Sequence, residues 1–330
     1  MRKIILRTVL CAVAALGAAG LRAQTQVKFG GFLAGEYLKG QTESAYARGT
    51  FGNLLAGATV SGVVSQKFAF ALEARALGES DFRVEQAWVG FVPSAVVGIK
   101  AGLFLVPFGA WNQANRPQET LLIGTPLNID YFYPESWREL GLLVDGKFGI
   151  LSYAAYIGNG LKEADMFRDG QQFSDNNKNK AKGGRLAVSI TQEVQAGLSY
   201  YTGKADDLDQ RSLTLTGAHL SWVTDGWEVH GEATRGTIQN PEPFDDGKSE
   251  GYSAWLVMKF ARIQPVGSYQ KVKYTDPYHA GGIALDLDRW TAGVRLVLGP
   301  NVFVKGEYEW NRETPRVQDN LLRVQAVVSF

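Results

Sequence analysis

The chain has 330 residues, of which 45% are hydrophobic and 20% are charged, and its formal charge of +1 argues against a nucleic-acid binder, which would be basic. Beyond the first two dozen residues, no stretch approaches the roughly 20 consecutive apolar residues that a transmembrane helix needs. The chain is therefore either water-soluble or distributes its apolar residues alternately along membrane-spanning strands.

The N-terminus has the three parts of a secretory signal: a basic start, an apolar run over residues 8–20 and a small residue, Ala23, at the expected cleavage site. We therefore predict a signal peptide at 1–23 and a single domain at 24–330. The only cysteine, Cys11, lies in the signal, so we expect the mature chain to have no thiol, disulfide or cysteine-bound metal. Removal of the four basic residues of the signal leaves a formal charge of −3.

The rest of the chain repeats an alternation of apolar and polar residues, which is the two-residue period of a β-strand. Near residue 70 this alternation places Phe68 and Phe70 on one face and Glu73 and Arg75 on the other. About sixteen such segments follow one another, near 27–38, 51–64, 67–78, 82–92, 95–106, 138–147, 150–158, 184–192, 194–202, 212–224, 226–237, 251–260, 263–275, 286–298, 301–311 and 320–330. An even number of antiparallel strands can close into a barrel with both termini on one side of the membrane.

The connections between these segments alternate between short and long, as a barrel with periplasmic termini requires. We expect tight turns near 65–66, 93–94, 148–149, 193, 225–226, 261–262 and 299–300, and outward loops at 39–50, 79–81, 107–137, 159–183, 203–211, 238–250, 276–285 and 312–319. The last strand ends on Phe330 and resembles the terminal strand of outer-membrane barrels. Aromatic residues expected at the membrane interface stand near strand ends: Tyr37, Trp88, Trp222, Trp227, Tyr252, Trp290, Tyr308 and Trp310.

These patterns predict an all-β protein, a transmembrane antiparallel β-barrel of about 16 strands in the outer membrane of a Gram-negative bacterium. The connection over 107–137 is the longest and is too apolar for a loop exposed to solvent. Long structured loops are usually functional, and we expect this one to fold inward and form a constriction. Its charged residues, the candidate lining, are Arg116, Glu119, Asp130 and Glu135. The alternative is that the loop packs on a partner subunit or caps the mouth.

One part of the chain resembles the phosphate-selective porin O and P family: VGIKAGLFLVPFGAWNQANRP, followed by SWRELGLLVDGKFG. In that family a strand that ends in a Pro-Phe-Gly turn runs into the constricting loop, and the next strand carries a pair of glycines, here Gly141 and Gly146. The resemblance is specific over 97–149 and architectural elsewhere. It implies a sixteen-stranded homotrimeric channel whose basic lumen residues draw in anions such as phosphate.

Charged residues of both signs fall on the face that is expected to meet water. Opposed charges are a common way for a porin to sort small solutes, although any one of these residues could instead form a salt bridge in the wall. The candidate pore-lining residues are Glu73, Arg75, Arg83, Glu85, Lys100, Glu139, Asp145, Arg185, Glu228, Glu232, Lys259, Lys271, Lys273, Arg295, Lys305, Glu307, Glu309 and Arg323. We therefore expect passive diffusion of small hydrophilic solutes or ions, with an anion or phosphate bias as the finer possibility.

Other chemistries have little support in the sequence. The three histidines are His219, His230 and His279, and a site of two histidines lacks the usual third metal ligand, so we expect no metal and no cofactor. No nucleophile elbow or phosphate-binding glycine loop is present, so we expect no enzyme. An outer-membrane barrel enzyme and a surface adhesin or structural barrel remain the alternatives. The expected partners are outer-membrane lipid including lipopolysaccharide, small hydrophilic solutes or anions, and two further copies of the chain.

Overall fold

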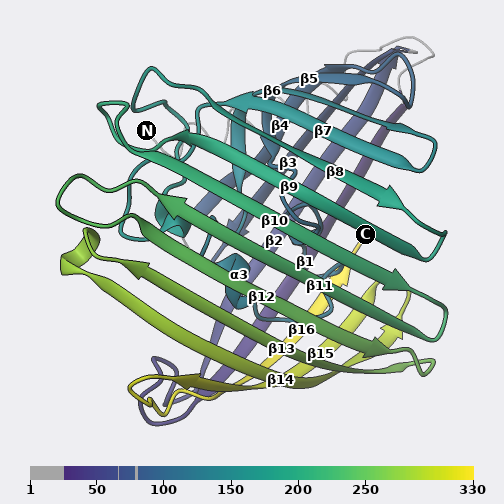
Figure 1. Ribbon diagram of the computed structural model, residues 1–330. Coiled ribbons are helices and arrows are strands. Elements are labelled where there is room, and N and C mark those ends of the chain that lie inside the picture. The colour runs from purple at the N-terminus through teal and green to yellow at the C-terminus, as the bar shows by residue number, and fades with distance from the viewer. Residues whose placement is uncertain (1–25, 66, 79–80) are drawn as a thin grey trace.

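The computed structural model describes residues 26–65, 67–78 and 81–330, in which sixteen strands form one closed antiparallel barrel (Figure 1). The predicted signal peptide, 1–23, lies outside the described residues, as do Gln66 and residues 79–80 in two of the predicted connections. Each strand pairs with the next one along the chain, and the last pairs with the first. The prediction of an all-β barrel of about sixteen strands is confirmed.

The strands agree with the predicted segments to within a few residues. They are β1 (Gln26–Gly40), β2 (Thr50–Ser65), β3 (Phe68–Leu77), β4 (Asp81–Phe91), β5 (Gly98–Leu105), β6 (Arg138–Phe148), β7 (Leu151–Gly158), β8 (Ala181–Ser189), β9 (Val194–Lys204), β10 (Ser212–Val223), β11 (Trp227–Ile238), β12 (Gly247–Met258), β13 (Ile263–Asp276), β14 (Ile283–Gly299), β15 (Val302–Glu313) and β16 (Leu321–Ser329). The connections contain the short helices α2 (Trp111–Ala114), α3 (Leu127–Asp130), η1 (Phe167–Asp169) and η2 (His279–Gly281). No helix in this part of the chain is long and apolar enough to cross a membrane.

The barrel closes where β1 meets β16. Gly31 and Phe330 exchange two backbone hydrogen bonds, each of 3.0 Å, and the pairing continues from Phe32 opposite Ser329 to Gly40 opposite Leu321. A closed sheet leaves no strand edge with unpaired peptide groups, which lipid could not satisfy. The C-terminal residue therefore takes part in the closure.

The connection between β5 and β6, residues 106–137, lies inside the barrel, where α3 contacts β11, β12 and β13 (Figure 1). Its buried aromatic side chains pack against the inner wall: the ring centroids of Trp137 and Tyr201 are 4.9 Å apart, and those of Trp111 and Trp255 are 5.5 Å apart. The wall residues of this apolar cluster come from β5 to β14. The loop therefore fills one side of the lumen.

Because of this packing, the inner face of β13 near the loop is apolar, and the charged residues of that stretch lie on the outer face. Val272 and Tyr274 face inward and are buried in the cluster, so Lys271 and Lys273 point outward, where both form ion pairs with Asp286. The placement of these two lysines in the pore lining was therefore wrong. An apolar loop inside the barrel demands apolar wall residues, so alternation alone does not reveal which face of this strand meets water.

Trp88 was predicted to lie at the membrane interface, and this prediction was wrong, because its side chain faces the lumen. The Lys100 ammonium lies 4.9 Å from the centre of its ring, and its indole N–H donates to Gln86. A β-bulge opposite Glu73 and Ala74 adds one residue to β4. The extra residue shifts the alternation along the rest of that strand.

Gly217 of β10 tests the contact between the loop and the wall. A Cβ atom at this position would lie 2.8 Å from the ring of Phe108, whereas Gly306 on the outer face of β15 has no atom within 4 Å of the corresponding position. We expect Gly217→Val to push Phe108 and the loop toward the open side of the lumen. The variant should lose about 1–3 kcal/mol of unfolding free energy and conduct less, whereas Gly306→Val should change neither. Denaturant unfolding in detergent and single-channel recording would measure both effects, and equal conductance in the two variants would contradict the expectation.

Candidate functional site

A buried amide closes the neck of the loop. The side-chain nitrogen of Asn112 donates to the carbonyl oxygens of Val106 (2.9 Å) and Trp137 (2.8 Å), and its oxygen accepts from the Trp137 backbone N–H (2.9 Å). Asn112 is fully buried, so these bonds satisfy polar groups that have no access to water. The first and last residues of the loop are thereby tied together. Asn112 was not among the predicted site residues, because an asparagine in a loop carries no pattern of its own.

Two wall carboxylates bind the loop backbone. Glu232 of β11 accepts from the N–H groups of Ala110 (2.8 Å) and Trp111 (2.6 Å), and Glu307 of β15 accepts from those of Ile123 (2.9 Å) and Gly124 (2.7 Å). Both carboxylates are buried beneath the loop. Both were predicted to line the pore, and the structure instead places them as anchors of the loop.

Polar groups of two further strands and a second residue of β15 add to this attachment. The Ser199 hydroxyl of β9 accepts from Gly109 N–H (3.0 Å), the Gln270 amide of β13 accepts from Leu127 N–H (3.0 Å), and Lys305 of β15 donates to the carbonyl oxygen of Pro117 (2.6 Å). The loop is held along most of its length by side chains that are distant in sequence.

Two more candidate residues of the wall, Glu85 and Glu139, also bind loop residues, although Glu139 binds the next loop along the chain. The buried Glu85 accepts from the Ser136 hydroxyl (2.5 Å) and lies 3.5 Å from the Arg138 guanidinium. Glu139 accepts from Gly160 N–H (2.8 Å) and thus holds the start of the next loop, residues 159–180. Glu85 and Glu139 were predicted to face the water in the pore, and they contact loop residues instead.

The four charged residues of the loop lie toward the unfilled side of the lumen. Arg116 binds Glu73 of β3 (2.6 Å) and Glu119 (3.1 Å), while Asp130 lies 3.5 Å from Arg168 of the following loop. Glu135 accepts from the Thr125 hydroxyl (3.3 Å) and remains exposed. With one cation and three carboxylates, the loop has a formal charge of −2.

The protein that encloses the lumen displaces part of the water around Asp130 and Glu135, although their side chains still reach solvent, and this desolvation raises the pKa of both above the ordinary value of a carboxyl group. The positive charge of Arg168 opposes the rise at Asp130, whereas the negative charge of Asp130 adds to the rise at Glu135. Both groups therefore take up protons at a higher pH than a carboxyl group in open water.

The wall opposite this edge carries four arginines, and each has a carboxylate partner. Arg75 pairs with Glu73 (2.8 Å) and Arg83 with Asp81 (2.5 Å). On the other side of the seam, Arg323 pairs with Glu309 (2.8 Å), and Arg289 lies 3.7 Å from that carboxylate. Arg289 was outside the predicted site, although it follows the same alternation as Arg295. The loop and this wall together form a passage lined by charges of both signs, which we call the constriction.

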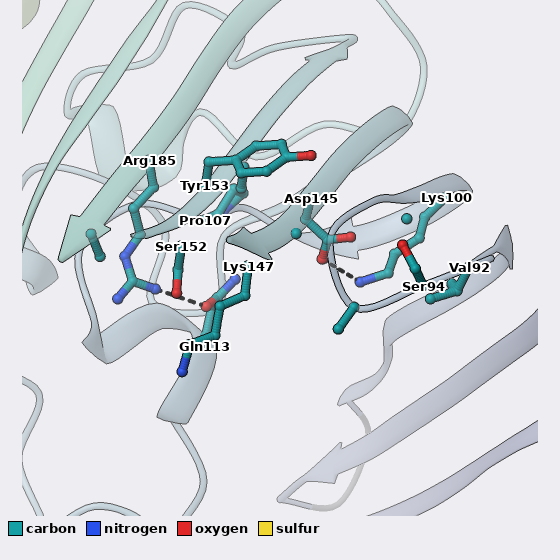
Figure 2. Close-up of a pocket in the computed structure, with 15 residues that line it drawn as sticks. Val92, Ser94, Lys100, Pro107, Gln113, Asp145, Lys147, Ser152, Tyr153 and Arg185 are labelled. Atoms are coloured by element: carbon teal, nitrogen blue, oxygen red, sulfur yellow. Dashed lines mark hydrogen bonds and ion pairs between the residues drawn. The ribbon is translucent and has the colours of Figure 1, made fainter. Parts of the chain in front are cut away.

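On the short-turn side of the constriction lies a pocket of about 350 Å³ (Figure 2). Lys100 and Asp145 form an ion pair of 2.5 Å there, and Arg185 donates to the side-chain oxygen of Gln113, a loop residue (3.1 Å). Lys147 lines the same pocket. Three of the candidate residues thus lie together beneath the loop.

The remaining candidates lie farther round the wall at the same end. Lys259 pairs with Glu228 (2.7 Å), and the guanidinium carbon of Arg295 lies 3.8 Å from the centre of the Phe303 ring. His230 contacts Glu228 (3.1 Å), and His219 contacts Arg185 (3.0 Å). Within residues 26–65, 67–78 and 81–330, no group of three or more His, Cys, Asp or Glu side chains has the arrangement of a metal site.

Comparison with known proteins identifies the family. A model described as "Gram-negative porin" matches residues 8–315. An uncharacterized protein of Aquifex aeolicus (strain VF5) is 25% identical over 174 residues, or 49% of this chain, and the match spans only 40% of that protein's length.

Three solved structures share the fold. An anion-selective porin from Comamonas acidovorans has a TM-score of 0.68 at 12% identity and covers 93% of this chain and 100% of that one. OmpF of Salmonella typhi in complex with daunomycin has a TM-score of 0.67 at 14% identity, with 92% and 97% covered. OmpT of Vibrio cholerae in its trimer form has a TM-score of 0.65 at 12% identity, with 93% and 100% covered.

Replacement of the two anchoring carboxylates tests how the loop is held. We expect Glu232→Ala and Glu307→Ala each to lower the unfolding free energy by about 1.5–3 kcal/mol, because each leaves two buried backbone N–H groups without their charged acceptor. Single-channel current should become noisier as the loop moves. Glu228→Ala is the matched control, since the contacts of Glu228 are with Lys259 and His230 and not with the loop. Equal noise in all three variants would show that these bonds do not restrain the loop.

The raised pKa values of Asp130 and Glu135 predict a pH-dependent selectivity. As the pH falls from about 7, these groups should become neutral before ordinary carboxyls, whose pKa values are about 4, and the loop should lose negative charge. The ratio of K⁺ to Cl⁻ permeability, measured from the zero-current potential in a salt gradient, should therefore decrease. The double variant Asp130→Asn with Glu135→Gln should lack this part of the response. A wild-type curve that coincides with that of the double variant would refute the prediction.

Proposed function

The chain belongs to the family of Gram-negative porins, and from this premise we propose that it is a general diffusion channel for small hydrophilic solutes, with no dedicated preference for phosphate. A porin is a channel of the outer membrane and not an enzyme. The observation that supports a general channel is the charge balance at the constriction. The wall arginines Arg75, Arg83, Arg289 and Arg323 all have carboxylate partners.

The resemblance over residues 97–149 to the phosphate-selective porin O and P family favours a bias toward anions. A phosphate site needs guanidinium or ammonium groups whose hydrogen bonds are free for the phosphate oxygens. At the constriction these groups are occupied: Arg116, for example, binds both Glu73 and Glu119. We therefore favour a modest charge bias set by the whole lumen over a stoichiometric phosphate site.

The assembly and surroundings follow from the same premise. We propose a homotrimer, as in the trimer form of OmpT of Vibrio cholerae, and export by means of the signal peptide at 1–23. We also propose that the outer face contacts outer-membrane lipid, including lipopolysaccharide. Exposed Tyr252 and Trp290 suit the membrane interface. Lys271 lies opposite Tyr252 in register, and Lys273 follows two residues later on the same outer face, at the level of charged headgroups.

Planar-bilayer recording of the purified mature protein tests the proposed function. We expect conductance to rise in proportion to salt concentration in potassium chloride and in potassium phosphate, because a wide charge-balanced passage has no site to saturate. Phosphate should not block the chloride current at millimolar concentration. Saturation of the phosphate current with such a block would favour the phosphate-selective alternative, and a protein without any conductance would favour a plugged structural barrel.

A further inference from the structure

The inner wall carries an excess of cations at one end of the barrel. Seven basic side chains of the inner wall lie within four residues of the short-turn end of their strands: Lys28, Lys100, Lys147, Arg185, Lys259, Arg295 and Lys305. Lys305 is buried against the loop, where it donates to Pro117, so six of them can face the passage. Two carboxylates, Asp145 and Glu228, lie on the same stretch of the inner wall, so the eight groups that can face the passage have a net charge of +4. We call this region the cationic vestibule.

The excess charge resides on four residues. Asp145 is bound to Lys100 (2.5 Å) and Glu228 to Lys259 (2.7 Å), which leaves Lys28, Lys147, Arg185 and Arg295. Within the described part of the chain, none of these four has a carboxylate oxygen within 4.0 Å. The turns beyond them add no net charge, because Lys67 and Arg262 balance Glu193 and Asp225.

Neutral groups hold Arg185 in place and leave its charge uncompensated. Its two terminal nitrogens contact the side-chain oxygens of Gln113 (3.1 Å) and Gln195 (3.2 Å) and a ring nitrogen of His219 (3.0 Å). Together with Lys147 it borders the pocket beneath the loop (Figure 2). A guanidinium fixed by amides in a narrow water-filled cavity creates a positive potential that attracts small anions.

The constriction beyond the vestibule has the opposite sign: the loop contributes −2, and the four wall arginines with Glu73, Asp81 and Glu309 contribute +1, which leaves a net charge of −1. Ions that cross the barrel from the periplasmic side therefore pass a region with excess fixed positive charge and then a region with excess fixed negative charge. A voltage that is positive on the long-loop side drives both kinds of ion toward the junction of the two regions and fills the passage. The reverse voltage drives both away and depletes it.

From this axial separation of charge we infer that the cationic vestibule concentrates small inorganic and carboxylate anions without a saturable binding site and makes the channel a rectifier, with larger currents when the extracellular side is positive. The inference rests on the proposed channel function. It predicts that the current depends on the sign of the voltage, which the constriction alone would not cause.

The test is a current–voltage curve of single channels in potassium chloride. At about 0.1 M salt the Debye length is about 10 Å, so the fixed charges act across the passage, whereas at about 1 M it is about 3 Å and they are screened. We expect asymmetric current at the lower concentration and a symmetric curve at the higher one. The orientation of each channel is read from Leu208→Cys, an exposed position in a long loop, labelled with a bulky impermeant thiol reagent from one side.

Two matched double variants identify the source of the asymmetry. Lys147→Gln with Arg185→Gln should reduce it by roughly half, since two of the four uncompensated charges are removed. Lys271→Gln with Lys273→Gln removes the same charge from the outer face and should leave the asymmetry intact. Inorganic pyrophosphate should also reduce the asymmetry at a lower concentration from the periplasmic side than from the extracellular side, because a multivalent anion screens the vestibule charges.

The possible outcomes separate the inference from the proposed function. A conducting wild-type channel with a symmetric curve at about 0.1 M salt overturns the rectifier and leaves the general channel in place. Equal loss of asymmetry in the two double variants overturns the assignment to the cationic vestibule. The absence of any current contradicts the proposed function itself. Heat-dependent migration of each variant in gel electrophoresis verifies that the barrel has folded.

Discussion

A peptide group in lipid has no water to bind, so every strand of a membrane-spanning sheet must be paired on both sides. The two backbone bonds between Gly31 and Phe330 meet this requirement at the seam of the barrel. Closure in turn creates an inner wall and an outer wall from alternate residues of the same strand. The lumen, its charges and the space available to the loop are all consequences of that closure.

The loop between β5 and β6 then divides the inner wall into two kinds of surface. Where it packs, the wall is apolar or presents single acceptors such as Glu232 and Glu307 to backbone N–H groups. Where it does not pack, arginines and carboxylates face each other across water. The same inward position on a strand can therefore serve burial or hydration, according to what stands opposite.

This division explains what the sequence could and could not predict. The sixteen strands follow from local alternation, and the loop was recognisable because Leu122, Ile129 and Phe132 could not remain in solvent. The roles of Glu232 and Glu307 depend on partners more than a hundred residues away, and no local pattern encodes them. The outward direction of Lys271 and the inward direction of Trp88 were missed because an apolar lumen and a β-bulge each break the simple rule of apolar outside and polar inside.

The neck formed by Asn112 has an evolutionary consequence. Because the Asn112 amide and a backbone hydrogen bond of 2.9 Å from Val106 N–H to the Trp137 carbonyl join the two ends, the segment between them is a self-contained insert whose ends are already fixed next to each other. Substitutions or length changes near its middle can reshape the aperture while the sixteen-stranded shell keeps its register. Permeability can thus diverge among descendants of such a chain without a new barrel having to evolve.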